Sequence, residues 1–164
     1  MLPKTPSFND LKPASEISSR AKRSNKRKDT LHEIELRREL WRLGLRYRKN
    51  VETLPGKPDI VFIRAKVAIF CDGDFWHGRD WENLRLKLEK GTNPEYWIAK
   101  IKSNIERDLR NNTILSDEGW LVIRIWETDV RKAPAKYAIE IKEIVASRVT
   151  QLKANLSKNR GSFK

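Results

Sequence analysis

Two carboxylates and a histidine lie close together in the segment 58–77, which reads PDIVFIRAKVAIFCDGDFWH. Asp59 comes directly before one apolar run, and Asp72 follows a second one. Carboxylate oxygens are the ligands that a hard ion such as Mg²⁺ selects, and histidine carries protons near neutral pH. Because both carboxylates come at the ends of neighbouring predicted strands, with His77 on the loop that follows, the pattern predicts a hydrolytic metal site.

Phosphodiester hydrolysis suits such a site. It needs a metal that polarises the phosphoryl oxygen and lowers the pKa of an attacking water, and a group that moves a proton. We expect the metal ligands to be Asp59, Asp72 and the main-chain oxygen of Cys71. We expect His77 to move the proton, with Asp108 fixing its tautomer and orientation.

One further residue and two structural alternatives qualify this hypothesis. Glu33, on the first predicted helix, could hold a metal-bound water. A structural alternative for Asp72 is a turn-forming role before Gly73, and His77 could instead be a loop residue packed against Trp76.

The chain has one cysteine, which excludes an internal disulfide and a cysteine-rich zinc cluster. Cys71 is expected to be a small buried residue and not a nucleophile. His32, beside the candidate Glu33, is expected on the surface of its helix and receives no role.

The elements that must position these residues follow from periodicity and from turn signals. In chain order they are a helix from Thr30 to a stop at Gly44, an edge strand over 45–51, strands over 59–63 and 66–70, a charged loop over 78–93 with at most one helical turn, a helix that starts at Asn93-Pro94, a strand over 120–127 in the centre of the sheet, and a helix over 133–149. This order predicts an α/β fold, with a single-domain mixed β-sheet flanked by helices.

The charge of the chain points to a polyanionic partner. It has 35 Lys and Arg against 22 Asp and Glu, a net charge of +13, which favours nucleic acid over an anionic membrane, with simple solubility as the alternative. The segment 1–29 is expected to be a basic, partly disordered arm, 30–150 the folded domain and 151–164 a basic tail. Within the arm, a solvated basic face is the alternative to DNA contact by four residues: Arg20, Lys22, Arg23 and Lys26.

Aromatic residues accompany the candidate site. Phe75 and Trp76 precede its histidine, and Trp97 lies on the next predicted helix. Core packing is one explanation. The other is a wedge that enters between base pairs and kinks the duplex.

At these residues the sequence resembles the very short patch repair (Vsr) endonuclease family, over roughly residues 18–131. Several motifs in the same order carry the resemblance: the basic run 20–28, Glu33, LPGKPDIVF (54–62), IFCDGDFWH (69–77), EYWIAKIKSNIERD (95–108) and GWLVIRIWE (119–127).

The resemblance implies a restriction-endonuclease-like fold and a Mg²⁺-dependent hydrolase that nicks one strand of double-stranded DNA at T·G mismatches. It implies metal binding by Asp59 and the main-chain oxygen of Cys71, and proton transfer by His77 supported by Asp108. By the same resemblance Glu33 contacts metal-bound water. The residues that intercalate beside the mismatch are Phe75, Trp76 and Trp97.

The chain also departs from the family pattern. Asp72 stands where the best-known members have a second histidine, and Asp74 stands at the cysteine of their GCFWH motif. Some members carry a structural zinc after this segment. With one cysteine and two histidines in the chain, we expect none here.

The sequence thus predicts a DNA endonuclease of mismatch repair. The alternatives are a restriction- or homing-type endonuclease that cuts matched sequence, and a non-catalytic DNA-binding module. We expect a monomer in the bacterial cytosol and nucleoid, with mismatch-repair proteins as conceivable partners. No signal peptide or membrane-spanning run is predicted.

Overall fold

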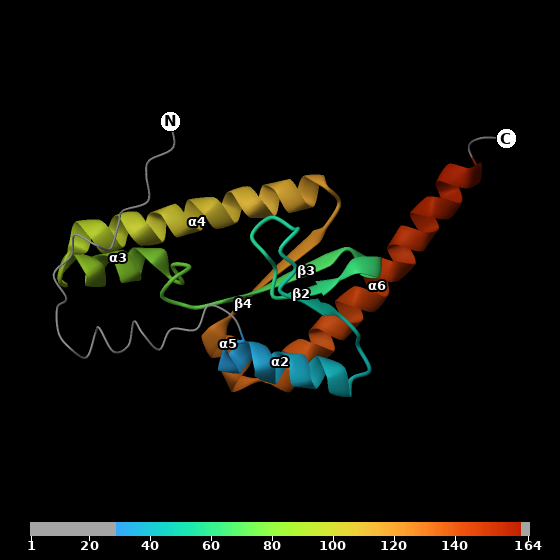
Figure 1. Ribbon diagram of the computed structural model, residues 1–164, viewed down its shortest axis with the longest axis horizontal. Coiled ribbons are helices and arrows are strands. Elements are labelled where there is room, and N and C mark those ends of the chain that lie inside the picture. The colour runs from blue at the N-terminus through green and yellow to red at the C-terminus, as the bar shows by residue number, and fades with distance from the viewer. Residues whose placement is uncertain (1–28, 162–164) are drawn as a thin grey trace.

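A computed structural model describes residues 29–161 of the protein, with side chains described through 157 (Figure 1). The predicted arm over 1–28, with Arg20, Lys22, Arg23 and Lys26, lies outside the described residues. In chain order the elements are α2 (Leu31–Arg42), β1 (Arg48–Lys49), β2 (Ile60–Phe62), the 3₁₀ turn η1 (Ile63–Ala65), β3 (Val67–Asp72), α3 (Trp81–Glu89), α4 (Pro94–Asp117), β4 (Leu121–Trp126), α5 (Glu127–Lys132) and α6 (Pro134–Gly161).

The sheet has four strands in the order β1-β2-β3-β4. The first two pairings are antiparallel, whereas β3 and β4 run parallel, with Cys71 opposite Ile125 and Asp72 opposite Trp126. The predicted mixed α/β architecture is therefore confirmed. The central position predicted for the strand over 120–127 is wrong, because β4 is the last strand of the sheet in the described part of the chain.

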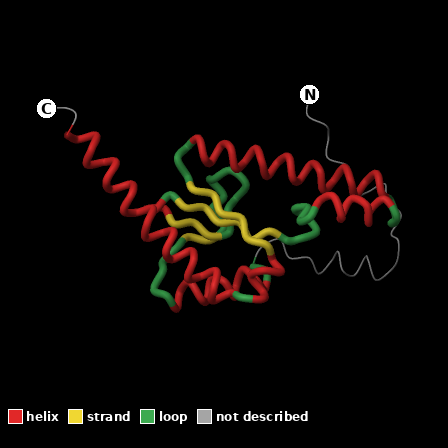
Figure 2. The backbone as a smooth tube through the Cα atoms, turned by 180° about the vertical axis from the view of Figure 1, so that it is seen from behind, coloured by secondary structure: helices red, strands yellow, loops and turns green. Residues whose placement is uncertain are grey.

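Helices cover both faces of the sheet (Figures 1 and 2). The larger core lies between the sheet and α2, α5 and α6, and includes Leu36, Ile69 and Ile141. A smaller core on the opposite face joins Phe70 to Leu115 of α4.

All six residues of β3 are buried, because both of its faces are covered. Side chains alternate between the two faces of a strand. Cys71 therefore lies in the larger core with Ile69, whereas Asp72 shares the α4 face with Phe70. The side chains of Cys71 and Asp72 therefore lie on opposite faces of the sheet.

Several predicted boundaries shift. The stop at Gly44 is confirmed, since its φ of +81° lies in the left-handed region. The loop expected over 78–93 contains α3, a nine-residue helix with no buried residue. Residues 151–161, expected as a tail, continue α6, whose distal turns extend away from the sheet (Figure 2).

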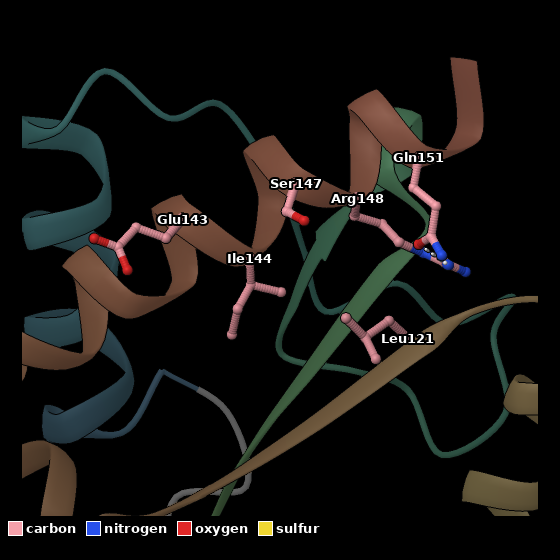
Figure 3. A pocket seen from close by; sticks show the side chains of 6 residues that line it. All are labelled: Leu121, Glu143, Ile144, Ser147, Arg148 and Gln151. Atoms are coloured by element: carbon pink, nitrogen blue, oxygen red, sulfur yellow. Dashed lines mark hydrogen bonds between the residues drawn. The ribbon is translucent and has the colours of Figure 1, made fainter. Parts of the chain in front are cut away.

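The helices and one surface pocket have two further properties. In the described part of the chain, no helix combines the length and the apolar character needed to cross a membrane. A pocket of about 320 Å³ lies between α6 and the start of β4 (Figure 3). It is at the opposite end of β4 from Trp126, and Arg148 crosses it to donate a hydrogen bond to the carbonyl of Gly119.

Candidate active site

Asp59 lies where the main chain enters β2, next to the end of β3. Its main-chain N–H donates to the carbonyl of Ile69 at 3.0 Å. Its carboxylate accepts a hydrogen bond of 2.7 Å from the main-chain N–H of Cys71. The strand pairing therefore brings the side chain of Asp59 to Cys71, the residue whose main-chain oxygen was expected to be a metal ligand.

The electrostatic surroundings of Asp59 are strongly negative. Burial raises its pKa to about 7, and the charges of Glu33 and Asp72 add to the increase, against the Cys71 hydrogen bond and the charge of Arg37. A carboxylate that ionises reluctantly beside two other carboxylates lies where a divalent cation would be stabilised.

Glu33 is buried at the first turn of α2 and is held by hydrogen bonds. Its carboxylate accepts bonds from the hydroxyl of Thr30 at 2.7 Å and from the N–H of Asp29 at 3.0 Å. An acidic residue in the first turn of a helix is favoured by the helix dipole. The bonds from Thr30 and Asp29 thus fix Glu33 on the side of the sheet that carries α2.

His32 is only 4% exposed, so its expected position on the surface is wrong. Its Nε2 lies 3.2 Å from the hydroxyl of Thr30. Because that hydroxyl donates to Glu33, it accepts from His32. The histidine therefore helps to orient the hydroxyl that holds Glu33.

Asp72 is buried against Arg124 of β4. Arg124 donates to one carboxylate oxygen through Nε at 2.5 Å and to the other through Nη2 at 2.9 Å. The guanidinium also lies over the ring of Phe70, with its carbon 4.5 Å from the ring centroid. The structure thus gives Asp72 an ion-pair partner in Arg124, and the metal-ligand role expected for Asp72 stays a prediction.

His77 and Asp108 form a hydrogen-bonded pair, with 2.5 Å between Nδ1 and a carboxylate oxygen. Burial alone would raise the pKa of Asp108, but the His77 hydrogen bond and the charge of Arg124 outweigh it and lower that pKa. An ionised carboxylate can only accept, so the Nδ1 of His77 carries the proton. In the neutral imidazole, a proton on Nδ1 leaves a lone pair on Nε2, as a proton acceptor requires.

Several contacts hold the loop of His77 against α4. Asn104 donates a hydrogen bond of 2.9 Å to the carbonyl of Trp76. Gly78 has a φ of +69°, and a Cβ built there would lie 2.5 Å from Ile105. Glycine is therefore required where the loop approaches the helix.

Asp74 ties the same loop to the end of the sheet. Its carboxylate accepts bonds from the hydroxyl and N–H of Thr128 at 2.6 and 3.0 Å, and from Arg79 at 2.8 Å. Burial opposes these bonds, but together they lower the pKa of Asp74. Arg79 reaches onward to Asp129 at 2.9 Å, so an ionic network fixes the loop.

The predicted aromatic residues form one cluster on the surface. Phe75 contacts Trp76 and Trp97, with ring centroids 5.2 and 5.6 Å apart. Phe75 is 37% exposed and Trp76 36% exposed. Phe75 and Trp76 are thus partly exposed close to His77, whereas Trp97 is half-buried.

The donor set bears on which metal the residues could hold. Among residues 29–161, no three or more His, Cys, Asp or Glu side chains converge as metal ligands. Mg²⁺ is commonly held by one or two carboxylates together with waters and substrate phosphates. The carboxylate of Asp59 and the carbonyl of Cys71, in a negative field, fit such an ion.

The thiol of Cys71 takes no part in this arrangement. It lies in the larger core, and burial raises its pKa. A buried, protonated thiol is a poor nucleophile.

The structure also assigns positions that sequence reasoning missed. Arg124 lies between two candidate carboxylates, since it contacts Asp108 at 3.3 Å as well as pairing with Asp72. An arginine in an otherwise apolar strand, WLVIRIWE, was the available signal.

Comparison with known proteins identifies similar chains. The sequence family described as DNA mismatch endonuclease Vsr matches residues 13–83. Type II nicking enzyme V.HpaIIP of Haemophilus parainfluenzae is 44% identical over 127 residues, which cover 77% of this chain and 89% of the relative.

Two other relatives show the range of similarity. Type II nicking enzyme V.NmeDIP of Neisseria meningitidis serogroup C is 48% identical over 74% of this chain and 81% of its own length. DNA mismatch endonuclease Vsr of Escherichia coli K12 is 36% identical over 63% of this chain and 65% of its own length.

Proposed function

The chain belongs to the Vsr family of DNA endonucleases, and on that premise we propose that it nicks one strand of a DNA duplex at a T·G mismatch in a Mg²⁺-dependent reaction. The observation that supports the chemistry best is the oriented pair of His77 and Asp108. His77 lies on the loop that follows β3, in the same segment 58–77 as Asp59, and Asp108 lies on α4. A proton carrier and a candidate metal ligand thus come from the two ends of one short segment.

Each residue of the candidate site has a distinct role in this proposal. Asp59 and the carbonyl of Cys71 would hold Mg²⁺, which, when bound, polarises the phosphoryl oxygen and lowers the pKa of a coordinated water. Nε2 of His77 accepts or delivers the proton, because Asp108 keeps the hydrogen on Nδ1. Glu33, held by Thr30, supplies a fixed acceptor on the α2 side.

Asp72 has a supporting role in this proposal. Its bidentate pair with Arg124 fixes the guanidinium. Arg124 in turn contacts Asp108 at 3.3 Å. The pair therefore positions the carboxylate that orients His77, and Asp59 remains the principal carboxylate ligand.

The aromatic cluster supports recognition of a mismatch. Rings of Phe75 and Trp76 that are partly exposed beside the proposed cleavage site could enter the base stack. Unstacking costs a few kcal/mol and costs less at a mismatched pair. Strand specificity would follow if one orientation of the wedge brings the thymine-side phosphate to His77.

A second candidate function is nicking or cutting of matched DNA, as in a restriction- or homing-type enzyme. It is favoured by the departure at Asp72, which stands where the best-known family members have a second histidine. The relatives named type II nicking enzymes belong to the same family and do not carry mismatch in their names.

A comparison of end-labelled duplexes that differ only by T·G or T·A at one position tests the proposal. A Mg²⁺-dependent nick confined to the mismatched thymine strand supports it. Equal cleavage of both duplexes would favour the matched-sequence alternative. Binding without cleavage across a broad duplex set would favour a non-catalytic module.

A further inference from the structure

A groove of about 710 Å³ separates α2 from the segment that contains β1. Four cationic side chains and one carboxylate line it together with apolar and aromatic ones: Asp29, Ile34, Arg37, Arg38, Trp41, Arg42, Tyr47 and Lys49. None of the proposed catalytic residues lines it. The positive charge of the groove is therefore separate from the proposed catalytic site.

We propose that this groove binds the sugar-phosphate backbone of the duplex on one flank of the cleaved site. The proposal rests on the DNA endonuclease activity and not on the mismatch preference. It adds to the catalytic site a surface that would position the substrate.

The groove is built from one stripe of α2. Its helical residues recur at intervals of three and four and so lie on one face. Arg38 and Arg42 are one turn apart, about 5–6 Å between their Cβ atoms. This spacing is comparable to that of successive phosphates along one DNA strand, so a backbone that follows α2 could meet both guanidinium groups.

The cations of the groove are incompletely neutralised. In residues 29–161, Arg38 has no acidic partner, although Arg42 pairs with Glu39 at 2.6 Å and Lys49 with Asp29 at 3.5 Å. Both of these pairs are exposed, so water screens them and a phosphate can compete for the cation. The groove thus presents positive charge that an anion can use.

Arg37 marks the inner wall of the groove. Its side chain is buried and pairs with Asp29 at 2.6 Å, but Nη1 has no hydrogen-bond partner within the described residues. A buried N–H without an acceptor is costly. An oxyanion in the groove could meet this donor with a small movement of the side chain.

The same arginine links the groove to the catalytic site. Arg37 lies 3.9 Å from Glu33, one turn away on α2, and its charge lowers the pKa of Asp59. Arg37 therefore contacts Glu33 and also lines the groove, which follows α2 as far as Arg42. A duplex at the catalytic residues would reach it without leaving the protein surface.

An exposed aromatic side chain forms the outer wall. Trp41 is 56% exposed, and the guanidinium carbon of Arg46 lies 3.7 Å from its ring centroid. This stacked pair keeps one more positive charge at the edge of the groove. A row of charges along an open groove fits an extended polyanion better than a single small anion, which requires donors that converge on one point.

The test compares two double variants by anisotropy of a fluorescent duplex in EDTA over a series of salt concentrations. Arg38→Gln with Arg42→Gln alters the groove. Lys136→Gln with Lys142→Gln removes the same charge from exposed positions on α6. Thermal unfolding of both variants checks that each is folded.

The groove variant is expected to reduce the slope of log K against log salt by about 1.8, since each phosphate contact contributes about 0.9. The control is expected to keep the wild-type slope. An unchanged slope in the groove variant, or an equal loss in the control, would overturn the proposal. So would binding of inorganic phosphate by the groove with no effect of the groove variant on DNA affinity.

The readout is independent of the proposed mismatch reaction. Because EDTA prevents Mg²⁺-dependent cleavage, the slopes can be measured on T·A and T·G duplexes alike. A protein that failed to prefer T·G would still show the groove effect, and a loss of the groove effect would leave the mismatch preference to be judged by cleavage.

Discussion

Both carboxylate oxygens of Asp72 accept hydrogen bonds from Arg124, at 2.5 and 2.9 Å. Burial opposes the charge of the guanidinium, but Asp72 and Asp108 together raise the pKa of Arg124, so Arg124 stays charged. This ion pair adds a structural role for Asp72, which the sequence presents as either a metal ligand or a turn-forming residue. A carboxylate that appears suited to a metal is here the anchor of the arginine that supports Asp108.

Asp72→Asn is therefore expected to destabilise the protein by about 3–5 kcal/mol, because it leaves a buried guanidinium without its main partner. Urea unfolding measures this change. The Mg²⁺ concentration that gives half-maximal cleavage should stay near the wild-type value. A large rise in that concentration with little loss of stability would instead make Asp72 a metal ligand.

Arg124→Gln provides the matched partner for a double-mutant cycle. The double variant is expected to lose less stability than the sum of the losses in the two single variants. Each single change leaves the other member of the pair without its partner.

His77→Asn is expected to lower the single-turnover cleavage rate by about 100-fold or more, because the proton carrier is lost. Asp108→Asn should also slow the reaction, since the amide can donate to Nδ1 and so favour the wrong tautomer. Because the two act as a unit, the double variant should be little slower than His77→Asn alone. Multiplicative losses would show that they act independently.

Trp76→Ala is expected to weaken binding of a T·G duplex by about tenfold, in line with the 1–3 kcal/mol typical of stacking a base on an aromatic ring. The matched duplex serves as the internal control, because phosphate contacts remain. Titration of both duplexes in EDTA measures the ratio. The wedge is refuted if both affinities fall equally.

The titration of Asp59 gives a pH prediction for the metal-free protein. Its pKa rises from an ordinary 3.8 to about 7 in the folded state, so the fold favours the protonated form. The resulting stabilisation is complete below about pH 4 and is lost as the pH rises through about 7. It amounts to a few kcal/mol at about 1.4 kcal/mol per unit.

Asp59→Asn should remove this dependence. In EDTA, the wild-type free energy of unfolding should fall between about pH 4 and 7 relative to that of the variant. Mg²⁺ at pH 8 should then stabilise only the wild type, because it binds the ionised carboxylate. Parallel stability curves for the two proteins would contradict the assignment.

The sequence predicted the part of the site that lies on one continuous segment. The proximity of Asp59 to Cys71 follows from two adjacent strands, and both strands have clear β-branched patterns. The pairing of His77 with Asp108 was anticipated across 31 residues. That pairing is supported by the motif EYWIAKIKSNIERD (95–108), which the chain shares with the family it resembles.

The features that the sequence did not predict depend on tertiary packing. Helix α3 buries no residue, so it has no amphipathic stripe that periodicity could detect. Strand β4 is apolar because helices cover it and not because strands flank it on both sides. The partner of Asp72 was missed because register alone brings Arg124 beside it, from 52 positions further along the chain.

The most direct test of the account is Mg²⁺-titrated cleavage of a labelled T·G duplex by the wild type and by Asp59→Asn, with duplex affinity measured in parallel in EDTA. We expect Mg²⁺-dependent nicking by the wild type. We expect no nicking by the variant at any Mg²⁺ concentration, although the variant should bind the duplex with near wild-type affinity. Wild-type cleavage rates in the variant, or cleavage in EDTA, would contradict the metal site on which the account depends.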